Sequence, residues 1–249
     1  MKVASSVILA RRKSLAELLK NHRYLPLAEV CARLGISQAT ARRDLRVLVR
    51  EKKITRTYGG ALGNFDATFA SFADRRAVDY DVKSRLAQNA RGFIRENTTC
   101  FFDSGTTIFA LAEALYRKSV AGLRAVTNSL PVAEMLGRAE VEVHLLGGRF
   151  LQRQSILLGA EARQSARHWK FDLVFLGAEG FSQGGIWASE PEVATFQKTL
   201  IAQAKRVIVC AHSAKLGRET GVLLSAWTSK FQLVTDVSPA QRARRGLPV

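Results

Sequence analysis

In the first fifty residues, hydrophobic positions recur at helical spacing in three successive segments, which predicts three helices. The first helix is expected at about residues 14–21, where leucines share one face. The second begins after Pro26 and ends before Gly35, since glycine commonly follows the last turn of a helix. The third begins at Ser37, a preferred N-cap residue, and has apolar residues on one side and arginines on the other. Two short helices joined by a glycine-containing turn are typical of a helix-turn-helix motif.

The segment after the third helix has the two-residue alternation of a strand rather than helical periodicity. Residues 52–62, KKITRTYGGAL, alternate with period two until Gly59-Gly60 interrupts the run, which predicts a short β-hairpin, or wing. We expect Lys52, Lys53 and Arg56 to reach either the phosphates or the minor groove of DNA.

From Thr98 onward, short apolar runs typical of buried strands alternate with segments of helical periodicity. We expect strands within residues 98–105, 123–129, 141–148, 171–180 and 206–213, and helices at about residues 83–95, 106–118, 130–138, 160–169 and 192–205. This alternation predicts an α/β fold with a largely parallel sheet. Residues 63–82 lack clear periodicity. The expected organisation is therefore a DNA-binding domain at residues 1–62, a linker at 63–82 and a larger domain at 83–249.

The charge of the chain is positive and unevenly distributed. The formal net charge is +17, and residues 1–62 hold 14 Lys and Arg against 4 Asp and Glu, a net charge of +10 in a quarter of the chain. Basic residues concentrated in one segment favour a polyanionic partner, because each phosphate contact releases a counterion. The alternative is a solvated basic helix face without a partner.

Cysteine and histidine are sparse and scattered. Cys31, Cys100 and Cys210 form no paired motif, which favours a reducing cytosol over a disulfide framework, and Cys100 and Cys210 lie in apolar runs typical of a core. The four histidines are far apart, so we expect no metal site and no cofactor. No apolar run is long enough for a membrane span or a signal peptide, so we expect a cytoplasmic protein.

In a helix-turn-helix, the N-terminal residues of the second helix meet base edges in the major groove. Glutamine pairs with adenine, and arginine pairs with guanine or phosphate. We therefore expect the DNA-binding residues to be Ser37, Gln38, Thr40, Arg42, Arg43, Arg46 and Arg56.

Polar loops follow the predicted strands, at the edge where open α/β sheets bind ligands. Residues 103–107, Asp-Ser-Gly-Thr-Thr, combine a glycine, three hydroxyls and a helix N-terminus, which favours an anion such as phosphate. An ordinary helix-capping loop is the alternative. Further polar loops lie at residues 127–129, 147–149, 177–180 and 212–215.

Residues 37–61, SQATARRDLRVLVREKKITRTYGGA, resemble the signature of the DeoR family of bacterial transcriptional regulators. The matching residues are Ser37, Thr40, Arg42, Arg43, Asp44, Leu45, Arg56, Gly59, Gly60 and Ala61. Asp44 would repel phosphate, so an internal ion pair with an arginine is expected for it rather than a DNA contact.

The larger domain also resembles the effector domain of that family, which is similar to the fold of ribose-5-phosphate isomerase. The resemblance implies a phosphorylated sugar or sugar derivative as effector. The residues it assigns to effector binding are Asp103, Ser104, Gly105, Thr106, Thr107 and Lys215. This chain departs from the family pattern at His212, where the family often has Asp, and at Thr195 and Gln197, which replace a Glu-x-Lys pattern.

Enzyme chemistry is the rival interpretation. Residues 180–184, Gly-Phe-Ser-Gln-Gly, match a hydrolase pattern, but that motif requires a helix directly after it, and the following residues do not have a helical pattern. A sugar-phosphate isomerase with a basic N-terminal domain and a non-specific nucleic-acid binder remain alternatives. The sequence favours a non-enzymatic, sequence-specific regulator that binds double-stranded operator DNA as a homo-oligomer (dimer or tetramer). The resemblance implies that it represses carbohydrate-metabolism genes.

Overall fold

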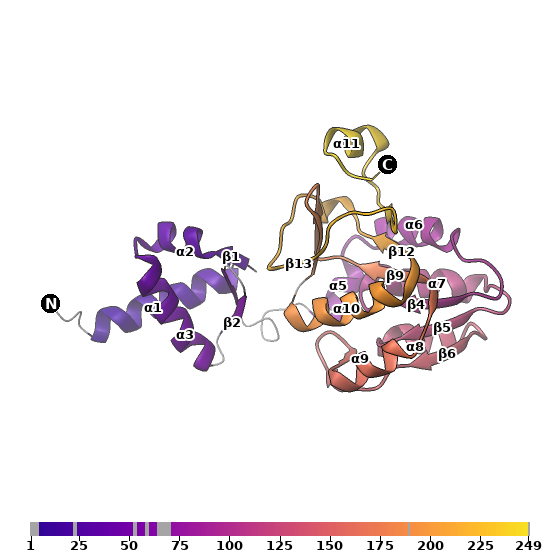
Figure 1. Cartoon of the computed structure of the whole chain (residues 1–249), viewed down its shortest axis with the longest axis horizontal. Coiled ribbons are helices and arrows are strands. Elements are labelled where there is room, and N and C mark those ends of the chain that lie inside the picture. Colours follow the sequence, from indigo (N-terminus) through magenta and orange to yellow (C-terminus); the bar gives the residue numbers. More distant parts are fainter. Residues whose placement is uncertain are drawn as a thin grey trace. The chain divides into compact units, whose positions relative to one another are not determined.

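The computed structural model describes residues 5–21, 24–51, 54–57, 60–63, 71–188 and 190–248. The chain divides into two compact units, Met1–Phe69 and Ala70–Val249 (Figure 1). The first unit has one hydrophobic core and the second has two. No helix among the described residues is long and apolar enough to cross a membrane.

The first unit contains the three helices that the sequence predicts, α1 (Ser5–Asn21), α2 (Leu27–Leu34) and α3 (Gln38–Arg50). Helix α1 begins well before the expected Ser14, because neither Gly nor Pro interrupts residues 5–13 and a helix can extend there without an apolar stripe. The helices meet in a core that buries Leu15, Leu19, Val30, Ala41, Leu45, Leu48 and Ile54.

A small antiparallel sheet completes the first unit. Strands β2 (Ile54–Thr57) and β3 (Gly60–Gly63) form the predicted wing, with Arg56 opposite Ala61. Strand β1 (Tyr24–Pro26) pairs with the other side of β3 and was not predicted, because three residues are too few to reveal an alternation. The described residues do not include Lys52, Lys53 or Gly59.

A six-stranded parallel sheet forms the centre of the second unit and confirms the predicted α/β fold. Its order is β14-β12-β9-β4-β5-β6, and every neighbouring pair is parallel. The strands are β4 (Thr99–Phe102), β5 (Arg124–Thr127), β6 (Glu142–Leu145), β9 (Phe171–Gly177), β12 (Ala204–Cys210) and β14 (Phe231–Val234).

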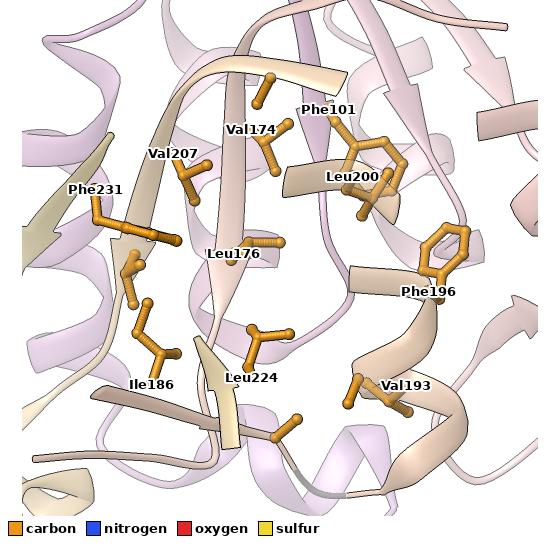
Figure 2. Packing of buried hydrophobic residues seen from close by; sticks show 14 of the residues in the cluster. Phe101, Val174, Leu176, Ile186, Val193, Phe196, Leu200, Val207, Leu224 and Phe231 are labelled. Carbon is orange, nitrogen blue, oxygen red and sulfur yellow. The ribbon is translucent and has the colours of Figure 1, made fainter. Parts of the chain in front are cut away.

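Helices cover both faces of this sheet, which explains the continuous apolar runs of its strands. Leu173 and Phe175 of β9 belong to one core, and the alternate residues Val174 and Leu176 belong to the other. The first core is closed by α6 (Tyr80–Arg91), α7 (Thr106–Arg117) and α8 (Leu130–Gly137). The second is closed by α9 (Ala160–Arg167) and α10 (Pro191–Gln203), and Figure 2 shows α10 packed against this face of the sheet.

Short elements in the connections were not predicted, because each is three to six residues long and lacks a detectable period. Strands β7 (Arg149–Leu151) and β8 (Ile156–Leu158) form a hairpin. Strands β10 (Gly180–Ser182), β11 (Gly185–Ala188) and β13 (Val222–Ser225) form an antiparallel sheet. A 3₁₀ turn, η1 (Ser213–Lys215), follows β12, and helix α11 (Pro239–Arg244) lies near the C-terminus.

Part of the stretch 63–82, which we interpret as a linker, belongs to regular structure. Residues 64–70 lie outside the described part, whereas α5 (Phe72–Ala77) and the start of α6 occupy most of the remainder. The ring of Phe72 packs edge-on against Phe109 of α7, with ring centroids 5.4 Å apart. Residues 72–82 therefore belong to the fold of the second unit.

Candidate functional site

Helix α3 begins at a capped N-terminus. Ser37 is extended, with φ −68° and ψ 155°, and its Oγ accepts a hydrogen bond from the backbone N–H of Thr40 at 3.2 Å. The two hydroxyls of Ser37 and Thr40 also lie 3.0 Å apart. This is the predicted N-cap, and it satisfies one of the backbone donors that every helix leaves unpaired at its start.

Helix α3 separates its packing residues from its charged residues. Ala41, Leu45 and Leu48 are buried in the core of the first unit. The opposite face is exposed along its whole length and carries Gln38, Arg42, Arg43 and Arg46, with Thr40 half-buried beside them. The structure thus brings the predicted DNA-binding residues of α3 to one surface, and the side chain of Arg56 lies outside the described part.

Asp44 is the buried polar residue of α3, at 1% exposure. Its carboxylate accepts hydrogen bonds from Arg11 Nε at 2.6 Å and from Arg12 Nε at 2.9 Å, both on α1. Burial alone would raise the pKa of Asp44, but the two arginines outweigh it and hold the pKa below its usual value. The expected ion pair is present, and its partners are distant in sequence.

The second candidate site lies where the order of the strands reverses. From β4 the chain proceeds through β5 to β6 on one side, and from β9 through β12 to β14 on the other, so the neighbours β4 and β9 form a topological switch point. In open α/β sheets, ligands bind beyond the carboxyl ends of the strands at such a point. Asp103 follows β4 directly, and Gly177 is the last residue of β9.

Asp103 is almost completely buried at this switch point. Its Oδ2 accepts hydrogen bonds from Gln197 Nε2 of α10 at 2.8 Å and from the Gly177 backbone N–H at 3.3 Å. Burial raises the pKa of Asp103 to about 6, although hydrogen bonds from Gln197, Ser104 and Gly177 oppose the shift. Gln197 was noted in the sequence only as a departure from a pattern, and its contact with Asp103 is a finding of the structure.

The loop after Asp103 leads directly into helix α7. Gly105 has φ +126°, a conformation that side-chain-bearing residues rarely adopt, and it is the N-cap of α7. Thr106 and Thr107 are buried in the first turn, and Ser104 is half-buried. The predicted loop residues therefore lie together at a helix N-terminus, where the helix dipole and unpaired N–H groups favour an anion.

Lys215 lies at the end of η1, beyond the carboxyl end of β12. Its Nζ is 3.1 Å from Glu179 Oε2, in the loop that follows β9. His212, the residue before η1, is buried with its Nδ1 3.5 Å from Asp79 Oδ2, and burial together with Lys215 lowers the pKa of His212. Lys215 is thus held at the same edge of the sheet as Asp103.

Lys83 is a buried cation that sequence reasoning missed. Its Nζ donates hydrogen bonds to the backbone carbonyls of Arg75 and Val78, and burial lowers its pKa. The available signal was its position, because Lys83 shares the buried face of α6 with Leu86 and Ala90. A charged residue at an apolar position of a helix indicates a buried partner.

The hydrolase-like segment does not form a nucleophile elbow. Ser182 ends β10, and β11 follows after a tight turn, so the helix that the motif requires is replaced by a strand. The Ser182 hydroxyl donates to Glu219 Oε1 at 2.8 Å.

Comparison with known proteins adds independent findings. Residues 11–65 match the family model described as the DeoR-like helix-turn-helix domain, and residues 78–237 match the DeoR C terminal sensor domain. The chain is 29% identical to the HTH-type transcriptional repressor GlcR of Bacillus subtilis (strain 168), over 93% of this chain and 89% of that protein. It is 28% identical to the glycerol-3-phosphate regulon repressor of Escherichia coli (strain K12), over 92% and 91%. Among solved structures, ribose 5-phosphate isomerase A of Methanocaldococcus jannaschii has a TM-score of 0.42 and 14% identity over 55% of each chain.

Proposed function

Since this chain belongs to the DeoR family of transcriptional regulators, we propose that a phosphorylated sugar or sugar derivative binds its second unit and thereby changes the affinity of its first unit for operator DNA. The protein is a DNA-binding regulator and not an enzyme, because its family and its matched relatives are regulators. It acts as a repressor of carbohydrate-metabolism genes. Our proposal concerns the chemical class of the effector and the roles of the individual residues.

The exposed basic face of α3 is the observation that supports the assignment of DNA contacts. Gln38, Arg42 and Arg43 stand on the N-terminal half of that face, which a helix-turn-helix places in the major groove. We assign base contacts to these side chains, with Arg46 and Arg56 at the DNA backbone. Ser37 and Thr40 contribute mainly by fixing the start of the helix.

The loop 103–107 is the observation that supports a phosphorylated effector. It joins the switch point of the sheet to the N-terminus of α7, and Gly105 leaves the backbone open for close approach. Lys215 supplies a positive charge at the same edge. Ligand binding shifts DNA affinity only if the ligand binds one conformation of the regulator more tightly than another.

The test is a DNA-binding assay against the upstream region of the protein's own gene at two salt concentrations, with and without a panel of sugar phosphates. We expect sequence-dependent binding that weakens with salt and changes with one member of the panel. Binding without sequence preference and without ligand response would contradict the proposal. Conversion of a sugar phosphate into a product would contradict the regulatory assignment itself.

We further propose that the protein acts in the cytoplasm as a homo-oligomer, a dimer or tetramer, because helix-turn-helix regulators usually read paired half-sites. Sedimentation at micromolar concentration is expected to give a mass above that of one 27.4 kDa chain. A purely monomeric result would refute the oligomer.

A further inference from the structure

The central sheet of the second unit ends in an edge strand, β6, that is exposed along much of its length. Strand β6 lies at one end of the strand order, and among the described strands only β5 pairs with it (Figure 1). Glu142 and Leu145 are exposed, with Leu145 at 42%, and the two residues between them are half-buried. The strand at the other end, β14, is buried at every position except Gln232. Of the two edges, β6 is therefore the one open to pairing with another strand.

Strand β6 lacks the features that usually keep an edge strand from pairing, which are a lysine, a proline or a bulge. Its sequence, Glu-Val-His-Leu, contains no lysine and no proline, and its register with β5 has no shift. Its acidic residue, Glu142, is already paired with Arg124 of β5. The half-buried ring of Trp169 lies beside the strand, with its centroid 4.7 Å from that of His144. Since aromatic side chains are enriched in protein interfaces, this edge has the character of a contact surface.

The backbone of β6 determines which of its polar groups face outward. The N–H of Leu146, directly after β6, donates to the Thr127 carbonyl of β5 at 2.8 Å. The N–H and C=O groups of successive residues in a strand point to opposite sides, so the other even-numbered residues of β6 also direct theirs toward β5. Val143 and Leu145 therefore direct their N–H and C=O groups away from the sheet. A strand added to this edge must form its hydrogen bonds with these two residues.

A second copy of β6 fits these groups when the two strands run antiparallel and are centred on Val143. In that register, Val143 exchanges both of its backbone hydrogen bonds with Val143 of the second copy. Glu142 then lies opposite His144 of the second copy, in the closely spaced type of pair, and an imidazole N–H can donate to a carboxylate. A centre one residue earlier or later would place two Glu142 or two His144 side chains opposite each other, and opposed like charges are destabilising. The side chains thus favour a single register.

We propose that two copies of the chain associate through β6, in antiparallel register about a two-fold axis at Val143, so that one sheet continues across both second units. The partner is a second copy because the pairing is self-complementary. The same strand supplies both members of each Glu142–His144 pair, as the isologous interface of a two-fold dimer requires. This inference rests on the homo-oligomer of the proposed function and names its interface.

Sedimentation of the full-length protein at micromolar concentration is the first test, with Leu145→Lys as the variant. Leu145 is exposed, so the substitution should leave the fold intact, which circular dichroism checks. A lysine in an edge strand opposes pairing, and we expect association to weaken about tenfold or more and the sedimenting mass to fall by half. Leu223→Lys is the matched control, because Leu223 is 41% exposed in β13, an edge strand of another sheet. It should keep the wild-type mass.

Cysteine crosslinking tests the register. Glu142→Cys and His144→Cys are each made in a Cys31→Ala background, because Cys31 is half-buried whereas the other two cysteines are buried. In the closely spaced type of pair, opposite Cα atoms are about 4.5 Å apart, which is within reach of a disulfide. Co-expression of the two variants followed by oxidation should therefore give a disulfide-linked dimer in several-fold higher yield than either variant alone.

The inference is overturned if Leu145→Lys keeps the wild-type mass, or if the co-expressed cysteine variants crosslink no better than either variant alone. In both cases an oligomeric wild type leaves the proposed homo-oligomer intact, with its interface elsewhere. A monomeric wild type would refute the homo-oligomer and the inference together.

Discussion

At the scale of single residues, Asp44 links α3, the helix that we propose to contact DNA, to the first helix of the chain. Its carboxylate is buried, and it pairs with two arginines that are each about one-fifth exposed. The acidic residue in the middle of α3 therefore contributes to the internal structure, because its charge is balanced by the two arginines of α1.

Asp44→Asn should lower the stability of the first unit by about 1–2 kcal/mol, because it leaves two cations without their carboxylate, although both can turn toward water. Because the pKa of Asp44 is depressed, its contribution is present at neutral pH and is lost as acid protonates the carboxyl in the folded state. Urea unfolding followed by circular dichroism measures the change.

Glu29→Gln is the matched control, because Glu29 forms an exposed pair with Arg33 one helical turn away. It should cost less than about 0.5 kcal/mol. Equal effects of the two variants would show that the Asp44 pairs contribute no more than surface ion pairs.

The pKa of Asp103 is shifted in the opposite direction from that of Asp44, since burial raises it to about 6. A carboxyl that holds its proton more tightly when folded stabilises the protein in acid and loses that contribution as pH rises through the folded pKa. The stability of the wild type, measured relative to Asp103→Asn, should therefore fall by about 1 kcal/mol from about pH 5 to about pH 7. Urea unfolding of both proteins across this range is the measurement, and a flat difference would contradict the raised pKa.

At the scale of elements, α3 serves two purposes on two faces. Since its arginines take no part in the core, Arg42→Ala and Arg43→Ala should each weaken operator binding about tenfold or more while leaving stability unchanged. Fluorescence anisotropy with operator DNA measures the loss. Arg138→Ala, which removes the same charge from an exposed site at the C-cap of α8, is the control for net charge. Wild-type affinity in both α3 variants would refute the assigned docking.

The junction of β4 and α7 is the corresponding element of the second unit. A Cβ added at Gly105 would meet no atom within 4 Å. The φ of Gly105, +126°, is nevertheless a conformation that residues with a side chain adopt only under strain. Gly105→Asp adds a negative charge where we place the phosphate, and it should abolish the ligand response while DNA binding persists. Lys215→Ala should weaken the response, and a full response in both variants would move the site elsewhere.

The sequence predicts elements with a regular apolar face well and short connecting elements poorly. The helices α2, α3 and α7 and the strands β4, β9 and β12 follow from apolar periodicity, because each buries a regular face. Helix α5 and the hairpin β10–β11 escape prediction, because each element is only three to six residues long and packs on distant segments: Phe72 of α5 packs on Phe109, and β11 pairs with β13. Distance along the chain also decides how much of the candidate site the sequence reveals. The loop 103–107 is contiguous and can be recognised in the sequence. The hydrogen bond between Gln197 and Asp103 joins residues 94 positions apart and cannot be predicted from it.

At the scale of the whole molecule, the proposed function requires that effector binding to the second unit and DNA binding to the first are coupled in free energy. If an effector changes operator affinity by some factor, operator DNA must change effector affinity by the same factor. Titrating a sugar phosphate from the panel into the free protein and into the protein–operator complex should give affinities whose ratio equals the effect of that compound on operator binding. Unequal factors would indicate that a further equilibrium, such as a change of oligomeric state, accompanies binding.

The division of α3 into a packing face and an exposed face has a consequence for the diversification of such regulators. If Gln38, Arg42 and Arg43 contact bases as we propose, substitutions there alter the recognition of DNA without creating cavities or unpaired charges in the core. Duplicated genes can therefore acquire new target sequences through a few surface changes while the scaffold is inherited intact. The same separation makes this helix a suitable starting point for engineering regulators with redirected targets.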